Sequence, residues 1–332
     1  MRQLDDAYPD AARDGNLRTE VNRRFLTSFS GLLDDISAAG LKTVPFREKL
    51  DNIDASRKIS GMCHVIYDRV LSAARQDDPG EVERILNCFL EIPDRVENAR
   101  VIGWYLDGYS IPLHELYFDA CDDSFLNTYG IHFDGENNSP EEYAQARAAL
   151  RQALEKMEAT APEIYGEFNT LISDVMALHS PTMNAATSIC ALGIIRVSQL
   201  RTGQTWTRYL ENLVHEAAHH HLNYVLFCDP VILNEDSGRY SSPLRREKRP
   251  LSGIYHAMFV LARTMYMIRV LQKHPDFDPE TDSIASAYNN AGNSSSFEQK
   301  FQDCWTVLKD HAKLTTVGMK LMESSREMAF EG

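Results

Sequence analysis

Two histidines four residues apart, His215 and His219, lie in an apolar stretch without glycine or proline. The surrounding Leu, Val, Ala and Glu residues favour a helix, and residues four apart on a helix project from one face. Two neutral imidazoles on adjacent turns form half of a typical site for a divalent transition metal. The remaining ligand must come from another part of the chain, so the fold has to bring a second element against this helix.

The residues around the two histidines predict that this helix is largely buried. Leu213 and Val214 precede the motif, and two alanines separate the histidines. Burying both imidazoles and Glu216 without compensation costs free energy, and a bound metal is a common compensation. The pattern His-Glu-x-x-His also occurs by chance, usually as two ordinary surface or core histidines. The apolar setting favours metal ligation over that explanation.

Two residues compete for the place of the third ligand. A thermolysin-like zinc site needs a later glutamate, and Glu235 follows His219 by 235 − 219 = 16 residues, but within the turn-like sequence Asn-Glu-Asp-Ser-Gly. His256 follows by 256 − 219 = 37 residues, at the start of an apolar helix where a lone histidine is otherwise hard to explain. We therefore expect His256 to be the third ligand. Three histidines suit zinc hydrolysis and non-haem iron chemistry equally.

An arginine-rich passage between the two predicted helices bears on the choice between these chemistries. It spans residues 239–253 and includes Arg245 and Arg249. A guanidinium fork beside a metal suits a dicarboxylate, such as 2-oxoglutarate, that chelates the metal with one end and pairs with arginine through the other. From composition alone, a solvated basic loop on an acidic protein explains the passage equally well.

Composition restricts the partners that the protein can have. The chain has 332 residues, of which 43% are apolar, and a formal net charge of −14 with scattered acidic residues. That charge argues against a binder of phosphate backbones and gives no sign of a membrane-surface patch. Because neither a signal peptide nor a run of about 18 apolar residues is evident, we expect a cytoplasmic protein. The six dispersed cysteines are expected to be free buried thiols.

Most of the sequence shows the apolar spacing of helices. The predicted helices are residues 17–39, 62–74, 81–90, 139–159, 162–178, 205–227, a long apolar helix after 256 and a closing helix or pair over 295–328. Residues 186–198 are rich in β-branched side chains and predict a strand with an irregularity at Gly193. Cys63 and His64 are expected in the core, on an apolar helical face.

These elements predict a mainly α (α+β) fold. We expect a helical bundle around the HExxH metal-binding helix, with a small sheet lining the active-site cleft. Residues 1–170 would form a largely helical N-terminal region packed against the core. Residues 171–332 would form the metal-site region with closing C-terminal helices, and the whole is expected to be one integrated domain.

Several short motifs around the metal-binding pattern are, in combination, specific. They are Leu213-Val214-His215-Glu216-Ala217-Ala218-His219, Tyr240-Ser241-Ser242-Pro243-Leu244-Arg245, Arg249-Pro250, Gly253, and His256-Ala257 with Phe259-Val260. Over roughly residues 175 to 270, the chain resembles the HExxH-motif family of peptide-modification proteins, which are regarded as 2-oxoglutarate-dependent peptide β-hydroxylases. The resemblance implies Fe(II), 2-oxoglutarate and dioxygen. It also implies hydroxylation of an unactivated β-carbon in a ribosomally made precursor peptide.

The resemblance assigns roles to individual residues. It implies that His215, His219 and His256 are metal ligands and that Arg245 and Arg249 are the candidates for binding 2-oxoglutarate. Glu216 would be a general base in a hydrolase and a ligand or orienting group in an oxygenase. Because no family motif is found in the first 170 residues, the same chemistry on a small amino-acid-like metabolite stays open.

Two other classes of protein also fit the sequence. An HExxH zinc metallopeptidase would place a carboxylate such as Glu235 at the metal and use Glu216 as its base. A non-catalytic, metal-stabilised helical protein would close the metal in a tetrahedral shell.

Overall fold

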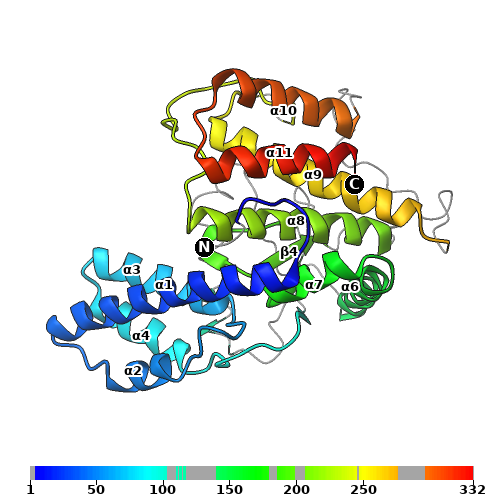
Figure 1. The fold of residues 1–332 in the computed structure, drawn as a ribbon. Helices are drawn as coiled ribbons and strands as arrows, with labels where there is room; N and C mark the ends of the chain where they lie inside the picture. Colours follow the sequence, from blue (N-terminus) through cyan, green and yellow to red (C-terminus); the bar gives the residue numbers. More distant parts are fainter. Residues whose placement is uncertain are drawn as a thin grey trace. The chain divides into compact units, whose positions relative to one another are not determined.

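A computed structural model describes residues 4–102, 110, 112–113, 115–116, 140–178, 185–198, 206–244, 247–275 and 296–331. Within these residues the fold is mainly helical with a small mixed sheet, which confirms the predicted fold class (Figure 1). The chain divides into two compact units, each assembled from separate segments. Unit 1 comprises Met1–Arg13, Gln152–Phe168 and Thr205–Gly332, and unit 2 comprises Asp14–Arg151 and Asn169–Gln204.

The helices of unit 2 build one apolar core. They are α1 (Ala11–Ala38, from Asp14 onward), α2 (Val44–Asp51), α3 (Met62–Arg75) and α4 (Pro79–Phe89). Phe29 and Phe89 are fully buried there, with ring centroids 5.0 Å apart. Cys63 and His64 are also buried, and the His64 ring lies 4.2 Å from that of Phe25. The prediction that these two residues belong to the core is confirmed.

Unit 2 also contains the sheet. Its strands are β1 (Arg100–Ile102), β2 (Asp174–Leu178), β3 (Ala185–Ala186) and β4 (Ile194–Ser198), in the order β1-β2-β4-β3. β1, β2 and β4 run parallel, and β3 pairs antiparallel with β4. The sheet and the HExxH motif lie in different units, so the lining of a metal cleft by the sheet stays a prediction.

The sequence interpretation was inaccurate on both sides of the strand β2. The helix predicted over 162–178 ends early, as α7 (Pro162–Leu171), and is followed by β2. The buried run Val175 to Ala177 lies between two neighbouring strands, and such short apolar runs fit a helix or a strand equally well. The strand predicted over 186–198 is divided into β3, a short 3-10 helix and β4. Gly193, with φ of +91°, makes the turn into β4.

Four helices form most of unit 1. They are α8 (Trp206–Leu226), which contains the HExxH motif, α9 (Leu251–Gln272), α10 (Phe297–His311) and α11 (Thr316–Phe330). The end of α6 (Pro140–Thr160) and most of α7 also belong to this unit. α9 is the common element, because α8, α10 and α11 all contact it (Figure 1).

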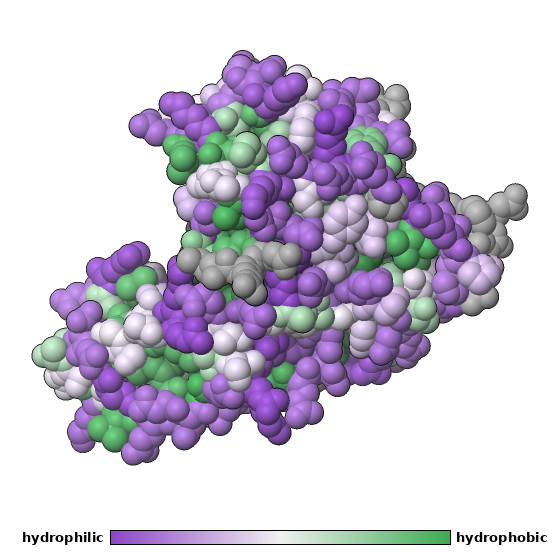
Figure 2. Space-filling model, viewed as in Figure 1, coloured by the Kyte–Doolittle hydropathy of each residue, from purple (hydrophilic) through white to green (hydrophobic). Residues whose placement is uncertain are grey.

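The apolar helix α9 begins earlier than expected. It starts at Leu251, directly after Pro250, so His256 lies in its second turn. By length and composition α9 could cross a membrane, but 67% of its most apolar window is buried inside the protein. Hydrophilic residues predominate on the face drawn in Figure 2.

The start of α9 and the segment before it contact the beginning of α11. The Tyr255 hydroxyl, buried next to His256 in the sequence, donates to the Gly318 carbonyl at 2.7 Å. Thr315 N donates to the Val231 carbonyl at 3.0 Å, and a Cβ at Gly318 would collide with that same carbonyl. Because only glycine fits at this position, the segment between α8 and α9 can lie directly against α11.

Candidate metal centre

One face of α8 differs from the rest of this buried helix. Between Thr207 and Val225, three residues keep partial exposure: Arg208, His215 and His219. They stand seven and four residues apart, which places them on one helical face. The predicted metal-binding face is therefore the accessible face of α8.

The structure brings His219 of α8 and His256 of α9 into contact. Their Nδ1 atoms are 3.3 Å apart, and the rings stack with centroids 5.5 Å apart at 26°. The ring of His215 is also close to that of His219, with the centroids 5.1 Å apart and the ring planes at 66°. Two of the three predicted ligands, 37 residues apart in the sequence, thus approach each other from two helices.

The distance between the two nitrogens fits a shared cation. Zinc–nitrogen bonds of about 2.0–2.1 Å at a tetrahedral angle place two nitrogens about 3.3 Å apart, which matches His219 and His256. His215 does not complete a three-histidine site in this arrangement. Among the described residues, ring nitrogens of all three histidines do not lie within 4.8 Å of one another. The His215 ring would have to turn about its side-chain bonds to complete the site.

Surrounding protein atoms keep this pair of imidazoles neutral. Burial lowers the pKa of His256 to about 4. Burial also lowers the pKa of His219 well below its ordinary value, with further contributions from His215, His256, His220 and Arg249. Metal ions bind the neutral form of imidazole, so both rings are ready to act as ligands at neutral pH.

Arg249 is held close enough to the histidines to influence His219 electrostatically. Its backbone forms a two-bond bridge with Tyr240, with both N–H to carbonyl distances at 2.8 Å. Its side chain lies against Gly253, one turn before His256 on α9. The structure therefore brings this predicted co-substrate residue to the candidate site. Arg245, the other candidate, lies outside the described residues.

The two glutamates considered from the sequence have different environments. Glu216 is buried, and its Oε1 lies 4.0 Å from His215 Nε2, although the two residues are about 100° apart around α8. Glu235 is exposed in a turn, where it accepts a hydrogen bond from the Ser237 hydroxyl at 3.5 Å. Neither the exposure nor the partner of Glu235 is that of a metal ligand.

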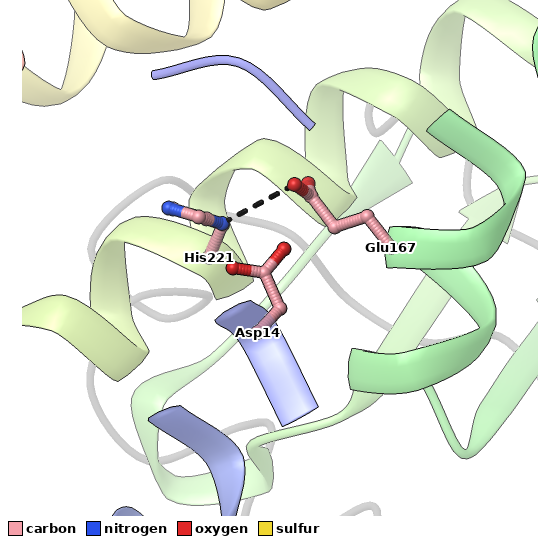
Figure 3. A group of neighbouring side chains, drawn as sticks. All are labelled: Asp14, Glu167 and His221. Carbon is pink, nitrogen blue, oxygen red and sulfur yellow. Dashed lines mark ion pairs between the residues drawn. The ribbon is translucent and has the colours of Figure 1, made fainter. Parts of the chain in front are cut away.

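A second group of polar side chains lies on the buried side of α8. Arg263 of α9 donates from Nη1 to Glu167 Oε1 of α7 at 2.7 Å, and its Nη2 is 3.2 Å from His221 Nδ1. His221 Nδ1 is also 3.5 Å from Glu167 Oε2, as the dashed line in Figure 3 marks. Asp14, which the same figure draws, belongs to unit 2. We call Glu167, His221 and Arg263 the rear cluster.

The rear cluster joins α7, α8 and α9. The His221 ring stacks on Phe259 at 5.4 Å, and the Arg263 guanidinium lies 5.3 Å from the same ring. Phe259 and Arg263 follow His256 by three and seven residues, on one face of α9. The contact that fixes α9 against α8 is therefore a continuation of the face that presents His256 to His219.

Reasoning from the sequence did not identify Glu167 or Arg263. A signal was present for Arg263, because a charged residue in the middle of an otherwise apolar helix requires a buried partner. Glu167 carried no such signal. It lies in a short helix whose buried face could not be read from its sequence.

Comparisons with known proteins add nothing to this geometry. No family model matches the chain, and no curated protein matches it.

Proposed function

We propose that the protein is a non-haem Fe(II)- and 2-oxoglutarate-dependent oxygenase, which hydroxylates a β-carbon of a residue in a ribosomally made precursor peptide. The observation that carries the proposal is the meeting of His219 and His256, as neutral imidazoles 3.3 Å apart, with Arg249 contributing to the lowered pKa of His219. The resemblance of residues 175 to 270 to HExxH peptide β-hydroxylases supplies the reaction and the class of substrate.

The residues present fit an iron ion. Two neutral imidazoles lie at a separation that suits a shared ion, and the ring of His215 is 5.1 Å from that of His219. An iron ion held by these three histidines would supply the one-electron chemistry that dioxygen needs. The overall reaction balances as 2-oxoglutarate, dioxygen and a C–H bond giving succinate, carbon dioxide and a C–OH group.

The chain's own residues have three tasks in this proposal. Arg249 pairs with the distal carboxylate of 2-oxoglutarate, because a guanidinium fork matches a carboxylate in shape and charge. Glu216 accepts a hydrogen bond from a ligand on its face of α8 and so orients it. The apolar interior around α8 and α9 excludes water from one side of the histidines.

A zinc peptidase is less well supported. A thermolysin-like site needs a carboxylate as the third protein ligand, whereas His256 is the residue that contacts His219 and Glu235 is exposed. A peptidase also gives no role to a guanidinium beside the ligands. A small amino-acid-like substrate would undergo the same chemistry, so the oxygenase proposal includes it as a variant.

Metal-dependent turnover of 2-oxoglutarate tests the proposal. We would reconstitute the purified protein with Fe(II) or with Zn(II) in the absence of oxygen, add 2-oxoglutarate and a pool of unstructured peptides, and then admit air. We expect succinate from the iron-loaded protein and none from the zinc-loaded protein or from His256→Ala. Peptide cleavage by the zinc-loaded protein, with no consumption of 2-oxoglutarate under either condition, would contradict the proposal.

A further inference from the structure

Asn212 of α8 is buried with an unsatisfied hydrogen-bond donor. Its side chain is 6% exposed, and among the residues that the structure describes its Nδ2 has no hydrogen-bond partner. Buried amide groups are nearly always paired, because an unpaired donor loses its hydration without replacement. An unpaired donor within a buried helix either lowers the stability of the fold or donates to a bound ligand.

The position of Asn212 points to a ligand. Asn212 precedes Glu216 by four residues and His219 by seven. At about 100° per residue it lies about 20° from His219 and about 40° from Glu216 around the helix. Asn212 therefore lies at the buried edge of the metal-binding face of α8, about one turn before His215 and about two turns before His219.

Asn212 also supplies what the other groups on this face do not. The histidines are neutral ligands, Glu216 is an acceptor when ionised, and Arg208 on the same face donates from Nη1 to Glu211 Oε2 at 3.3 Å. A 2-oxo acid that chelates a metal uses its keto oxygen and one carboxylate oxygen, and its distal carboxylate pairs with an arginine. The second oxygen of the chelating carboxylate then requires a donor, and an amide N–H is suited to it.

We propose that Asn212 binds the co-substrate by donating from Nδ2 to the chelating carboxylate of the 2-oxo acid. This assignment rests on the proposed oxygenase function. It divides the recognition of 2-oxoglutarate between two elements, with Asn212 of α8 at the metal end and Arg249, just before α9, at the distal end.

The test uses an isosteric apolar replacement. Asn212→Leu removes the donor and keeps the shape, and Asn212→Asp replaces the donor with a charged acceptor. We would load each variant with Mn(II) in the absence of oxygen, so that no reaction occurs, and measure 2-oxoglutarate binding by calorimetry. Asn87→Leu is the control, since Asn87 is an exposed residue of α4 in unit 2.

We expect 2-oxoglutarate to bind about 10-fold more weakly to Asn212→Leu, a change typical of the loss of one buried hydrogen bond, and more weakly still to Asn212→Asp. Mn(II) should bind all variants equally. The melting temperature of metal-free Asn212→Leu should equal or exceed that of the wild type, because the unsatisfied donor is gone.

Different failures have different meanings. Wild-type affinity in Asn212→Leu, a lowered melting temperature, or an equal loss in Asn87→Leu would overturn the role of Asn212 and leave the oxygenase proposal standing. A wild-type protein that binds Mn(II) but not 2-oxoglutarate would overturn both.

Discussion

Two histidines on α8, His219 and His221, are two residues apart and have opposite environments. His219 faces another neutral imidazole, that of His256, and keeps partial exposure. His221 is 1% exposed and lies between the carboxylate of Glu167 and the guanidinium of Arg263. The first environment offers two imidazole nitrogens to a ligand, whereas the second contains the carboxylate of Glu167 already paired with Arg263 and, at 3.7 Å, with Arg13.

The difference separates a ligand site from a structural contact. In the buried ion pair of Glu167 and Arg263, each charge already has an opposite partner at 2.7 Å. Two imidazole nitrogens at 3.3 Å accommodate either one shared proton or one shared cation, and the cation satisfies both lone pairs. We infer that the rear cluster holds α8 and α9 together so that His219 and His256 can bind the same ion.

Removing one partner of the rear cluster should have the largest effect. Arg263→Ala leaves Glu167 as a buried charge without its closest partner, and such losses typically cost about 3–5 kcal/mol of unfolding free energy. Denaturant unfolding of the metal-free protein would measure it. The exposed Arg326, which stacks on Trp305, is a control whose replacement by Ala should cost less than about 1 kcal/mol. Equal losses in the two variants would mean that the rear cluster is not a structural contact.

Replacing Arg249 should reduce the binding of the co-substrate and leave folding unchanged. Arg249→Ala should weaken the binding of 2-oxoglutarate by about 2–5 kcal/mol, because a charge-assisted pair loses one partner. Arg249→Lys should restore only part of this, since an ammonium cannot reproduce the guanidinium fork. Calorimetry on the Mn(II)-loaded protein would measure both, with the exposed Lys248→Ala as the control. Unchanged affinity in Arg249→Ala would transfer the role to another residue.

Glu211 provides a third environment on α8, a buried carboxylate with one cation beside it. Its side chain is 1% exposed, and burial raises its pKa to about 7, although Arg208 at 3.3 Å opposes the rise. Between the ordinary pKa of 4.5 and about 7, the folded chain holds a proton that the unfolded chain has released. The stability from this proton is therefore fully present below pH 4.5 and is lost as the pH rises through 7.

A pH series would check this linkage. The unfolding free energy of the wild type, relative to Glu211→Gln, should fall by about 2–3 kcal/mol from about pH 4.5 to about pH 8. A pH-independent difference would mean that Arg208 keeps Glu211 ionised throughout, in which case α8 carries a permanent ion pair next to the metal face.

Helix periodicity and ligand spacing predicted the framework of the site. The helix expected near 205–227 is present as α8, and His256 does meet His219 from the next helix. These features depend on local patterns of four and seven residues, which a sequence displays directly. The start of α9 was misplaced because the interpretation began the helix at His256, although Pro250 is a common residue at a helix start.

Contacts between distant segments could not be predicted in the same way. Glu167 and Arg263 are 96 residues apart, and nothing in either local sequence specifies the other. The strand β2 was assigned to a helix because its apolar run is explained only by its neighbours β1 and β4. Asn212 was overlooked because an asparagine in a helix is unremarkable until its burial and missing partner are known.

Metal titration of matched histidine variants tests the central claim most directly. We would titrate Mn(II), Fe(II) and Zn(II) into the wild type, His219→Ala, His256→Ala and His221→Gln, in which glutamine keeps an acceptor for Arg263. We expect one bound ion in the wild type and in His221→Gln, and affinity at least about 100-fold weaker in the two alanine variants, because each loses one of three protein ligands. Full binding in His256→Ala, or loss of binding in a folded His221→Gln, would contradict the assignment of His219 and His256 to the metal site.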